Sequence, residues 1–240
     1  MTEEAKLLAE NVAVIRQKME NAAREAGRRP EDVLLCAASK TRTVETVRLA
    51  SALDIDIFGE NHVQELIEKF DAGAYAGKPA HMIGHLQTNK VKQVVGRASL
   101  IHSVDSLKLL NTIEKEAAKR DLCQDILIEV NIGGEESKSG TTPETLWELA
   151  DQAEAMEHIR LRGLMPIPPV NDDDEENRRQ LGRMYRLYRE LAEKGYATAR
   201  IDTLSMGMSG DYENAIREGA TIVRVGTAIF GERYYPPKKV

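Results

Sequence analysis

Short apolar runs alternate with longer amphipathic stretches along almost the whole chain. The apolar runs that we interpret as strands lie at 33–38, 56–59, 81–84, 100–103, 126–131, 161–165, 203–206 and 222–225. Stretches with helical spacing lie near 43–52, 61–70, 87–96, 106–119, 143–157, 176–194 and 210–218. Each strand is therefore followed by a crossover long enough to place the next strand parallel to it.

Eight alternating units predict an α/β protein with a (β/α)8 barrel of the TIM type, and a doubly wound parallel sheet is the alternative. An extra helix is expected before the first strand, over 3–26, because apolar residues recur there at helical spacing: Leu7, Leu8, Val12, Ile15 and Met19. The 240 residues are 42% hydrophobic and 30% charged, which suits a barrel of this size. We expect residues 1–240 to form a single domain.

Charge argues against nucleic acid as a partner. The chain has 33 basic and 39 acidic residues, a net charge of -6, and no concentrated basic segment offsets the excess. The acidic run from Asn171 to Glu176 is interpreted as a loop that enters a helix, since the positive end of a helix favours acidic side chains.

The number of cysteines and the hydropathy of the chain indicate the cell compartment in which we expect the protein. Cys36 and Cys123 are too few for a disulfide framework and lack metal-binding spacing, so a reducing cytoplasm fits. Residues 1–29 are charged throughout and lack the apolar centre of a signal peptide. No apolar run approaches the ~18 residues needed to span a bilayer, so we expect a soluble protein without a membrane partner.

Glycines with neighbouring hydroxyl residues follow the seventh and eighth predicted strands, in the runs 204–211 and 223–231. Glycine lets backbone N–H groups approach an anion, and hydroxyl groups add donors. TIM-type barrels commonly bind phosphate after these two strands. The pattern predicts a phosphate site that includes Ser209, Gly226 and Thr227, although a helix cap and a tight turn favour the same residue types.

Lys40 lies at the carboxyl end of the first predicted strand. A lysine that faces a phosphate site suggests a phosphorylated aldehyde held as a Schiff base. The amine must be neutral to react, so its usual pKa of ~10.4 has to be lowered by desolvation or nearby positive charge. A surface lysine that ends a strand is the alternative, and the residues alone leave both open.

Six segments, in the same order and spread over nearly the whole chain, closely resemble the pyridoxal phosphate homeostasis protein family. They are 38–41 (ASKT), 58–65 (FGENHVQE), 83–90 (IGHLQTNK), 163–168 (GLMPIP), 204–209 (LSMGMS) and 224–231 (RVGTAIFG). The resemblance implies a barrel like that of alanine racemase, fold type III of proteins that use pyridoxal 5'-phosphate (PLP). It also implies PLP as cofactor, a role in vitamin B6 homeostasis, and no firmly assigned reaction.

The resemblance also implies roles for individual residues. Lys40 matches the lysine that forms the Schiff base, and Ser209, Gly226 and Thr227 match the phosphate contacts. Arg224 matches the position that faces the pyridine nitrogen, with a buried ion pair as the alternative. A guanidinium keeps its proton near neutral pH, so the pyridine stays unprotonated and is a weak electron sink. Asn61 is a plausible contact of the ring oxygen or of the lysine.

Other residues support weaker hypotheses. His81 and His85 are four apart, but a strand would not give them the shared helical face of a metal pair, so no metal is expected. His85 could line the pocket or be hydrogen-bonded without chemistry. Lys138 is either an anion contact or a loop lysine, and Met206 and Met208 either contact the ring or fill the core.

Three functions remain. The first is a PLP carrier or buffer without an assigned reaction, a monomer that supplies apo PLP-dependent enzymes. The second is an amino acid racemase of the alanine type, which uses two bases. In alanine racemase one base is a tyrosine from an additional C-terminal domain, which we expect to be absent because the chain stops at Val240. Tyr234 and Tyr235 are poor replacements. The third is a barrel that binds another phosphorylated metabolite without covalent chemistry.

Overall fold

A computed structural model describes residues 2–133, 139–166 and 173–232, and within them the chain alternates strands and helices. The strands are β1 (Leu34–Ala38), β2 (Ile57–Glu60), β3 (Ala80–Met82), β4 (Leu100–Val104), β5 (Gln124–Val130), β6 (Ile159–Pro166), β7 (Thr203–Leu204) and β8 (Ile222–Val225). The helices are α1 (Glu3–Glu25), α2 (Val44–Ser51), α3 (Val63–Asp71), α4 (Val91–Val94), α5 (Leu107–Ala118), α6 (Leu146–Glu154), α7 (Asp174–Glu193), α8 (Tyr212–Arg217) and α9 (Thr227–Phe230).

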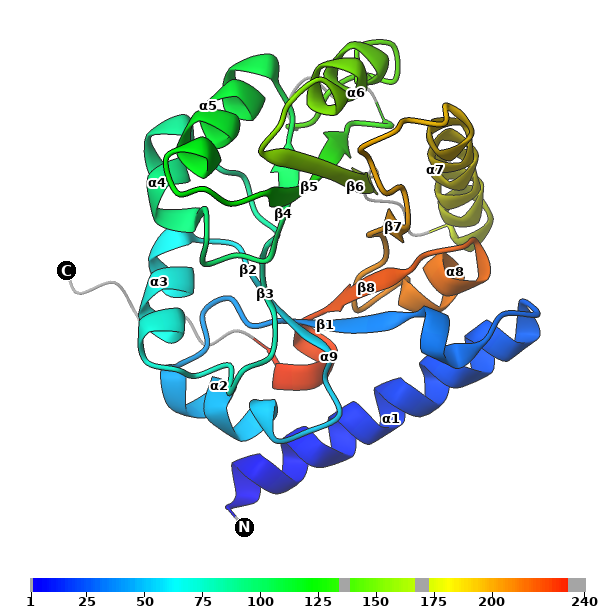
Figure 1. Cartoon of the computed structure of the whole chain (residues 1–240). Helices are drawn as coiled ribbons and strands as arrows, with labels where there is room; N and C mark the ends of the chain where they lie inside the picture. Colours follow the sequence, from blue (N-terminus) through cyan, green and yellow to red (C-terminus); the bar gives the residue numbers. More distant parts are fainter. Residues whose placement is uncertain (1, 134–138, 167–172, 233–240) are drawn as a thin grey trace, which may run out of the picture.

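All eight strands are parallel and follow one another in the order β7-β6-β5-β4-β3-β2-β1-β8. The sheet closes where β7 meets β8: the Met206 amide donates to the Ile222 carbonyl (3.1 Å), and the Arg224 amide donates to the Gly207 carbonyl (3.0 Å). Figure 1 shows the strands in the middle with the helices around them. This is the predicted (β/α)8 barrel, and the sequential strand order excludes the doubly wound alternative.

The strands are buried on both faces, which is why they read as apolar runs. Side chains on the inner face fill the barrel: Cys36, Ile57, Leu100, Leu127, Met165 and Ile222. The alternate residues, such as Leu35, Phe58 and Val223, pack against the helices. The barrel interior is therefore a filled core, and an open pocket is expected only at its ends.

The extra helix α1 lies along the outside of the barrel beside α8, α9 and α2 (Figure 1). It buries Leu8, Val12, Ile15 and Met19, as its spacing predicted. Leu7 was expected on the same face, but its side chain is 56% exposed because it lies one residue outside the buried stripe. The helix begins at a threonine cap, in which the Thr2 hydroxyl accepts from the Ala5 amide (3.2 Å).

Several predicted elements differ from the structure in their bounds; the strand expected over 203–206, for example, ends at Leu204. The helix expected over 87–96 is a short 3-10 turn (Thr88–Lys90) followed by α4, which ends at Val94, two residues before Gly96 with its left-handed φ of 80°. The strand expected over 81–84 ends at Met82. The acidic run, from Asp173 onward, does enter a helix: the Asp173 carboxylate accepts from the Glu175 amide (2.9 Å) at the start of α7.

Among the described residues, no helix combines the length and the apolar character needed to cross a membrane. The longest, α1 and α7, both carry charged side chains throughout.

Candidate functional site

A pocket of about 510 Å³ opens at the carboxyl ends of the strands. It brings together all of the residues that the sequence singled out for the site: Lys40, Asn61, Ser209, Arg224, Gly226 and Thr227. Residues from β3, β5 and β6 or their ends complete the lining, among them Ile83, Glu129 and Met165. Side chains that lie far apart in the sequence thus face a single cavity at the barrel end where such proteins place their active sites.

Lys40 and Asn61 follow the neighbouring strands β1 and β2, and both side chains are half-buried. Directly after Lys40 the chain turns sharply, with Thr41 in the left-handed region at φ 66°. Asn61 lies against Gly84 so closely that a Cβ atom on Gly84 would come within 2.3 Å of the Asn61 carbonyl oxygen. Glycine at position 84 therefore allows the ends of β2 and β3 to approach each other at the pocket wall.

The loops after β7 and β8 are joined by Ser209. Its hydroxyl oxygen accepts from the amides of Gly226 (3.1 Å) and Ala228 (3.3 Å), at the start of α9. Gly207, with a left-handed φ of 93°, turns the chain between β7 and Ser209. Backbone amides and a hydroxyl group meet here, which is the donor set expected of an anion site.

Arg224 points from β8 into the barrel and is half-buried. Its Nη1 donates to the carbonyl oxygen (2.5 Å) and the hydroxyl oxygen (2.7 Å) of Ser205. Burial lowers the pKa of the guanidinium, but an arginine remains cationic at neutral pH. The side chain is thus a fixed positive charge and hydrogen-bond donor in the pocket.

Glu129 lines the pocket and was missed by the sequence analysis. It lies on β5, is 1% exposed, and accepts from the Ser139 hydroxyl at Oε1 (2.6 Å). Its Oε2 is buried without a hydrogen-bond partner among the described residues. Burial raises the pKa of this carboxyl, and the nearby charge of Asp105 raises it further. Alternation along β5 carried the signal, since Leu127 and Glu129 share the inward face.

The rim of the pocket holds His85, for which the sequence left open a place in the pocket lining or a hydrogen-bonded histidine without chemistry. Its Nδ1 lies 3.8 Å from Oδ2 of Asp105, and the imidazole side chain is 56% exposed. Met208 also lines the pocket, whereas Met206 is buried in the core. Lys138, Tyr234 and Tyr235 lie outside the described residues.

His81 does not face His85; it pairs with a histidine that the sequence left unmarked. Within the barrel, Nδ1 of His81 is 2.9 Å from Nε2 of His102. Burial lowers the pKa of both, to about 3 for His81, so both are neutral at pH 7. In the described part of the chain, no group of three or more histidine, cysteine or acidic side chains is placed to hold a metal ion.

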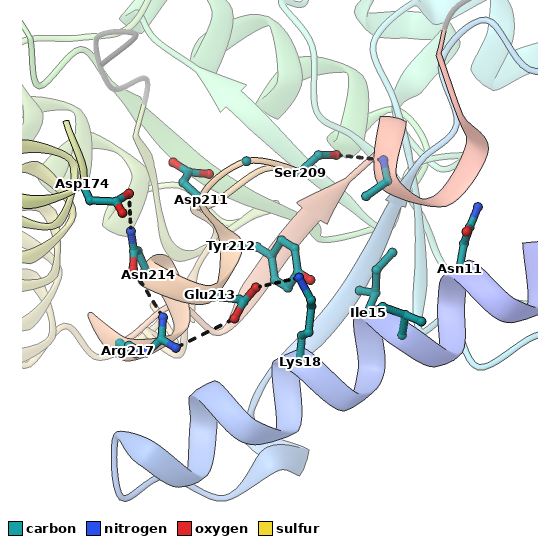
Figure 2. Close-up of a pocket in the computed structure, with 13 residues that line it drawn as sticks. Asn11, Ile15, Lys18, Asp174, Ser209, Asp211, Tyr212, Glu213, Asn214 and Arg217 are labelled. Carbon is teal, nitrogen blue, oxygen red and sulfur yellow. Dashed lines mark hydrogen bonds and ion pairs between the residues drawn. The ribbon is translucent and has the colours of Figure 1, made fainter. Parts of the chain in front are cut away.

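A second hollow, of about 460 Å³, lies outside the barrel between α1 and α8 and shares Ser209 with the first (Figure 2). Its charged groups pair with one another: Lys18 Nζ is 3.3 Å from Glu213, and Arg217 is 3.8 Å from the same carboxylate. Asn214 donates to Asp174 (3.4 Å). The Lys18–Glu213 pair joins α1 to α8, and the Asn214–Asp174 hydrogen bond joins α8 to α7.

Comparisons with known proteins agree with this geometry. The family model described as alanine racemase, N-terminal domain, matches residues 7–234. The pyridoxal phosphate homeostasis protein of Aquifex aeolicus is 42% identical over 226 residues, which cover 94% of this chain and 98% of that protein.

Solved structures with a similar fold include proteins related to this chain in sequence. A protein from Bifidobacterium adolescentis has 34% identity and a TM-score of 0.90, with 96% of this chain and 97% of that chain covered. PipY of Synechococcus elongatus, in a structure with PLP bound, has 30% identity and a TM-score of 0.80, with 93% and 100% covered. The resemblance in the sequence motifs is confirmed, and the chain belongs to the pyridoxal phosphate homeostasis protein family, within the wider alanine racemase N-terminal domain family.

Proposed function

We propose that this protein binds PLP in the pocket at the carboxyl end of the barrel and serves intracellular PLP homeostasis. It holds the cofactor as a Schiff base on Lys40, for buffering or delivery. The observation that carries the proposal is the convergence of the lysine, the arginine and the glycine-hydroxyl loops on one cavity. The bound PLP of PipY and the names of the curated relatives support it.

The residues present fit a PLP-sized ligand. A cavity of about 510 Å³ lies within the usual range for small-molecule sites. The buried Glu129 Oε2, which lacks a partner among the described residues, is a group that a ligand would satisfy. The Ser209 hydroxyl oxygen accepts from the Gly226 and Ala228 amides, and its own O–H group is a donor for a phosphate at the start of α9.

Each residue has a distinct task in this proposal. Lys40 supplies the amine that condenses with the aldehyde and releases one water molecule. Ser209, Gly226 and Thr227 bind the phosphate, and Asn61 binds the ring oxygen or orients the lysine. When bound, PLP supplies a reactive aldehyde and a conjugated ring that accepts electrons.

Arg224 bears on which reactions a bound PLP could support. Because its guanidinium is a donor that keeps its proton, it hydrogen-bonds an unprotonated pyridine nitrogen and holds the ring in place. A carboxylate at this position would favour the protonated ring that stabilises carbanions. The arginine therefore argues against transamination.

The wider assignment follows from the same reasoning. We propose that residues 1–240 act as one PLP-binding domain, as a monomer in the cytoplasm, and that apo PLP-dependent enzymes receive the cofactor. The free thiols of Cys36 and Cys123 suit a reducing compartment.

A transfer experiment tests the carrier function. Protein loaded with PLP and freed of excess cofactor is mixed with an apo PLP-dependent enzyme, and the recovered activity is followed over time. We expect recovery faster than the protein alone releases PLP on dialysis, and no racemisation of L-alanine. Racemase activity that disappears in Lys40→Ala would instead favour the alternative enzyme. Loss of all ligand on dialysis would favour a different, noncovalently bound phosphorylated metabolite.

A further inference from the structure

A fully buried ion pair lies between β2 and α3, on the outer side of the sheet. The Lys69 ammonium is 2.9 Å from Oε1 and 3.0 Å from Oε2 of Glu60, and the two side chains are 1% and 0% exposed. The same two elements otherwise bury apolar side chains such as Phe58 and Leu66. Removing two charges from water costs several kcal/mol, which the pair regains only with good geometry. Packing alone therefore does not explain this pair.

Two further hydrogen bonds of the pair end at Ser39, the residue before Lys40. Lys69 Nζ donates to the Ser39 carbonyl oxygen (2.7 Å), and the Ser39 hydroxyl donates to Glu60 Oε1 (2.5 Å). Ser39 itself is fully buried. The carbonyl and hydroxyl groups of this residue thus bind the ion pair, while its amide donates to the Gly59 carbonyl (3.0 Å).

The residue after Lys40 is bound to the same network. The Thr41 amide donates to Glu65 Oε2 (2.9 Å), and that oxygen is 3.5 Å from Lys69 Nζ. Thr41 has a φ of 66°, a conformation that is uncommon for residues other than glycine and needs support from its surroundings. Ser39 and Thr41, on either side of Lys40, are therefore both held through Lys69.

The network also reaches the next strand. Glu60 is the last residue of β2 and directly precedes Asn61, the half-buried residue that lines the pocket. Tyr75 adds a further donor, with its hydroxyl 3.3 Å from Glu60 Oε1. Burial raises the pKa of Glu60, while the charge of Lys69 opposes that rise.

We propose that the Glu60–Lys69 ion pair is a positioning device that fixes the backbone of residues 39–41 and so orients the Lys40 amine toward the aldehyde of a bound PLP. The inference rests on the proposed function. Lys69 acts through Ser39 and Thr41 and is a positioning residue. In the step that it supports, the Lys40 nitrogen and the aldehyde carbon form a C=N bond and one water molecule leaves. An error of about 1 Å in such an alignment can slow a reaction 100-fold.

Hydrogen exchange on the ligand-free protein gives the first test. Lys69→Met removes the donor to Ser39 while keeping an unbranched apolar chain. Glu60→Gln/Lys69→Met also removes the carboxylate that the single variant leaves buried and unpaired. The peptide that covers residues 38–43 should exchange faster in both variants. Arg162→Met, which breaks an ion-paired cluster at the other end of the barrel, should leave that peptide unchanged.

The rate of adduct formation gives the second test. Protein is mixed with PLP, the yellow absorbance is followed in time and against pH, and borohydride reduction locates the adduct. We expect the double variant to fold. PLP should react with its Lys40 at least ten-fold more slowly than in the wild type, and the dependence of this rate on pH should be shifted. Arg162→Met should match the wild type in both respects.

The two tests separate the proposals. The positioning role is wrong if the double variant folds and matches the wild type both in hydrogen exchange at residues 38–43 and in the rate of adduct formation at Lys40. If the wild type itself forms no adduct, the proposed function fails, and the exchange result alone decides whether the ion pair holds residues 39–41.

Discussion

Two sites at opposite ends of the barrel, the partly buried Arg162 cluster and the buried Glu129, differ in whether their polar groups find partners within the chain. Near the amino ends of β5, β6 and β7, Arg162 donates to Asp125 (2.5 Å) and to both oxygens of Asp202 (2.9 and 2.8 Å), so the charges are satisfied within the chain. At the carboxyl end, Glu129 leaves Oε2 without a partner among the described residues. Internal pairing serves stability, whereas a buried group left unpaired at a pocket is available to a ligand.

Lys40→Ala should produce the largest difference between the two ends. The side chain is half-buried at a strand end and contributes little packing, so thermal unfolding should stay within about 2 °C of the wild type, a small shift in free energy. The covalent adduct with PLP should disappear completely. Lys92→Ala, at an exposed position on α4, serves as the matched control and should retain the adduct. Global unfolding of Lys40→Ala would count against the assignment.

Arg162→Met should instead lose stability and keep PLP binding. Removing the cation takes away the partner that Asp125 and Asp202 share, although Arg160 (3.6 Å from Asp125) and Arg200 (2.8 Å from Asp202) still contact them. The free energy of unfolding should fall by about 1–2 kcal/mol. Urea denaturation measures the loss. PLP binding by the folded variant should equal that of the wild type, and weaker binding would contradict the separation of the two ends.

Substitution of Glu129 by leucine should weaken PLP binding and stabilise the ligand-free protein. Glu129→Leu removes a buried carboxyl with one unsatisfied oxygen, so the ligand-free protein should become more stable by about 1 kcal/mol. PLP affinity should fall about ten-fold, the loss of about one hydrogen bond. Glu129→Gln keeps a neutral hydrogen-bonding group and should bind nearly as well as the wild type. A loss of stability in Glu129→Leu, measured in urea, would mean that the carboxyl is structural.

The smallest expected effect is the change in unfolding free energy with pH that is due to His81 and His102. Burial lowers the pKa of both histidines. The positive charge of Arg162 lowers the pKa of His81 further, and His81 and Arg224 lower that of His102. An unfolded histidine titrates near ~6.5. The folded state therefore binds fewer protons below that pH, and stability is lost as pH falls from ~6.5 toward the folded pKa of about 3 for His81.

The loss between pH 7 and 6 should be less than about 1 kcal/mol for each histidine. The double variant His81→Gln/His102→Gln should flatten the dependence of unfolding free energy on pH. His158→Gln is the control with the opposite sign, because its hydrogen bond to Glu114 raises the folded pKa and stabilises the acid side. An unchanged slope in the double variant would show that the pair does not titrate in this way.

The barrel could be predicted from sequence because its strands are buried on both faces and therefore appear as apolar runs. The pocket residues could be predicted because strand ends meet at one side of a parallel barrel. Lys40 and Arg224 lie 184 positions apart, yet Lys40 lies two residues after β1, Arg224 is the second-last residue of β8, and both line the cavity. Their roles toward PLP stay predictions that the proposed experiments address.

Partners that depend on register and packing could not be predicted. Lys69 has the position of an ordinary polar residue in the last turn of α3, and only the packing of α3 on β2 places it beside Glu60. His81 and His102 meet because β3 pairs with β4. Glu129 is one acid in an apolar run, and its burial depends on the neighbouring strands.

Borohydride reduction of the PLP-treated protein, followed by peptide mass spectrometry, tests most directly whether the carboxyl end of the barrel is a PLP site. The account predicts about one pyridoxyl group per chain, located on Lys40, and a yellow absorbance that bleaches on reduction. A colourless protein that stays unmodified, or modification spread over exposed lysines such as Lys92, would contradict it.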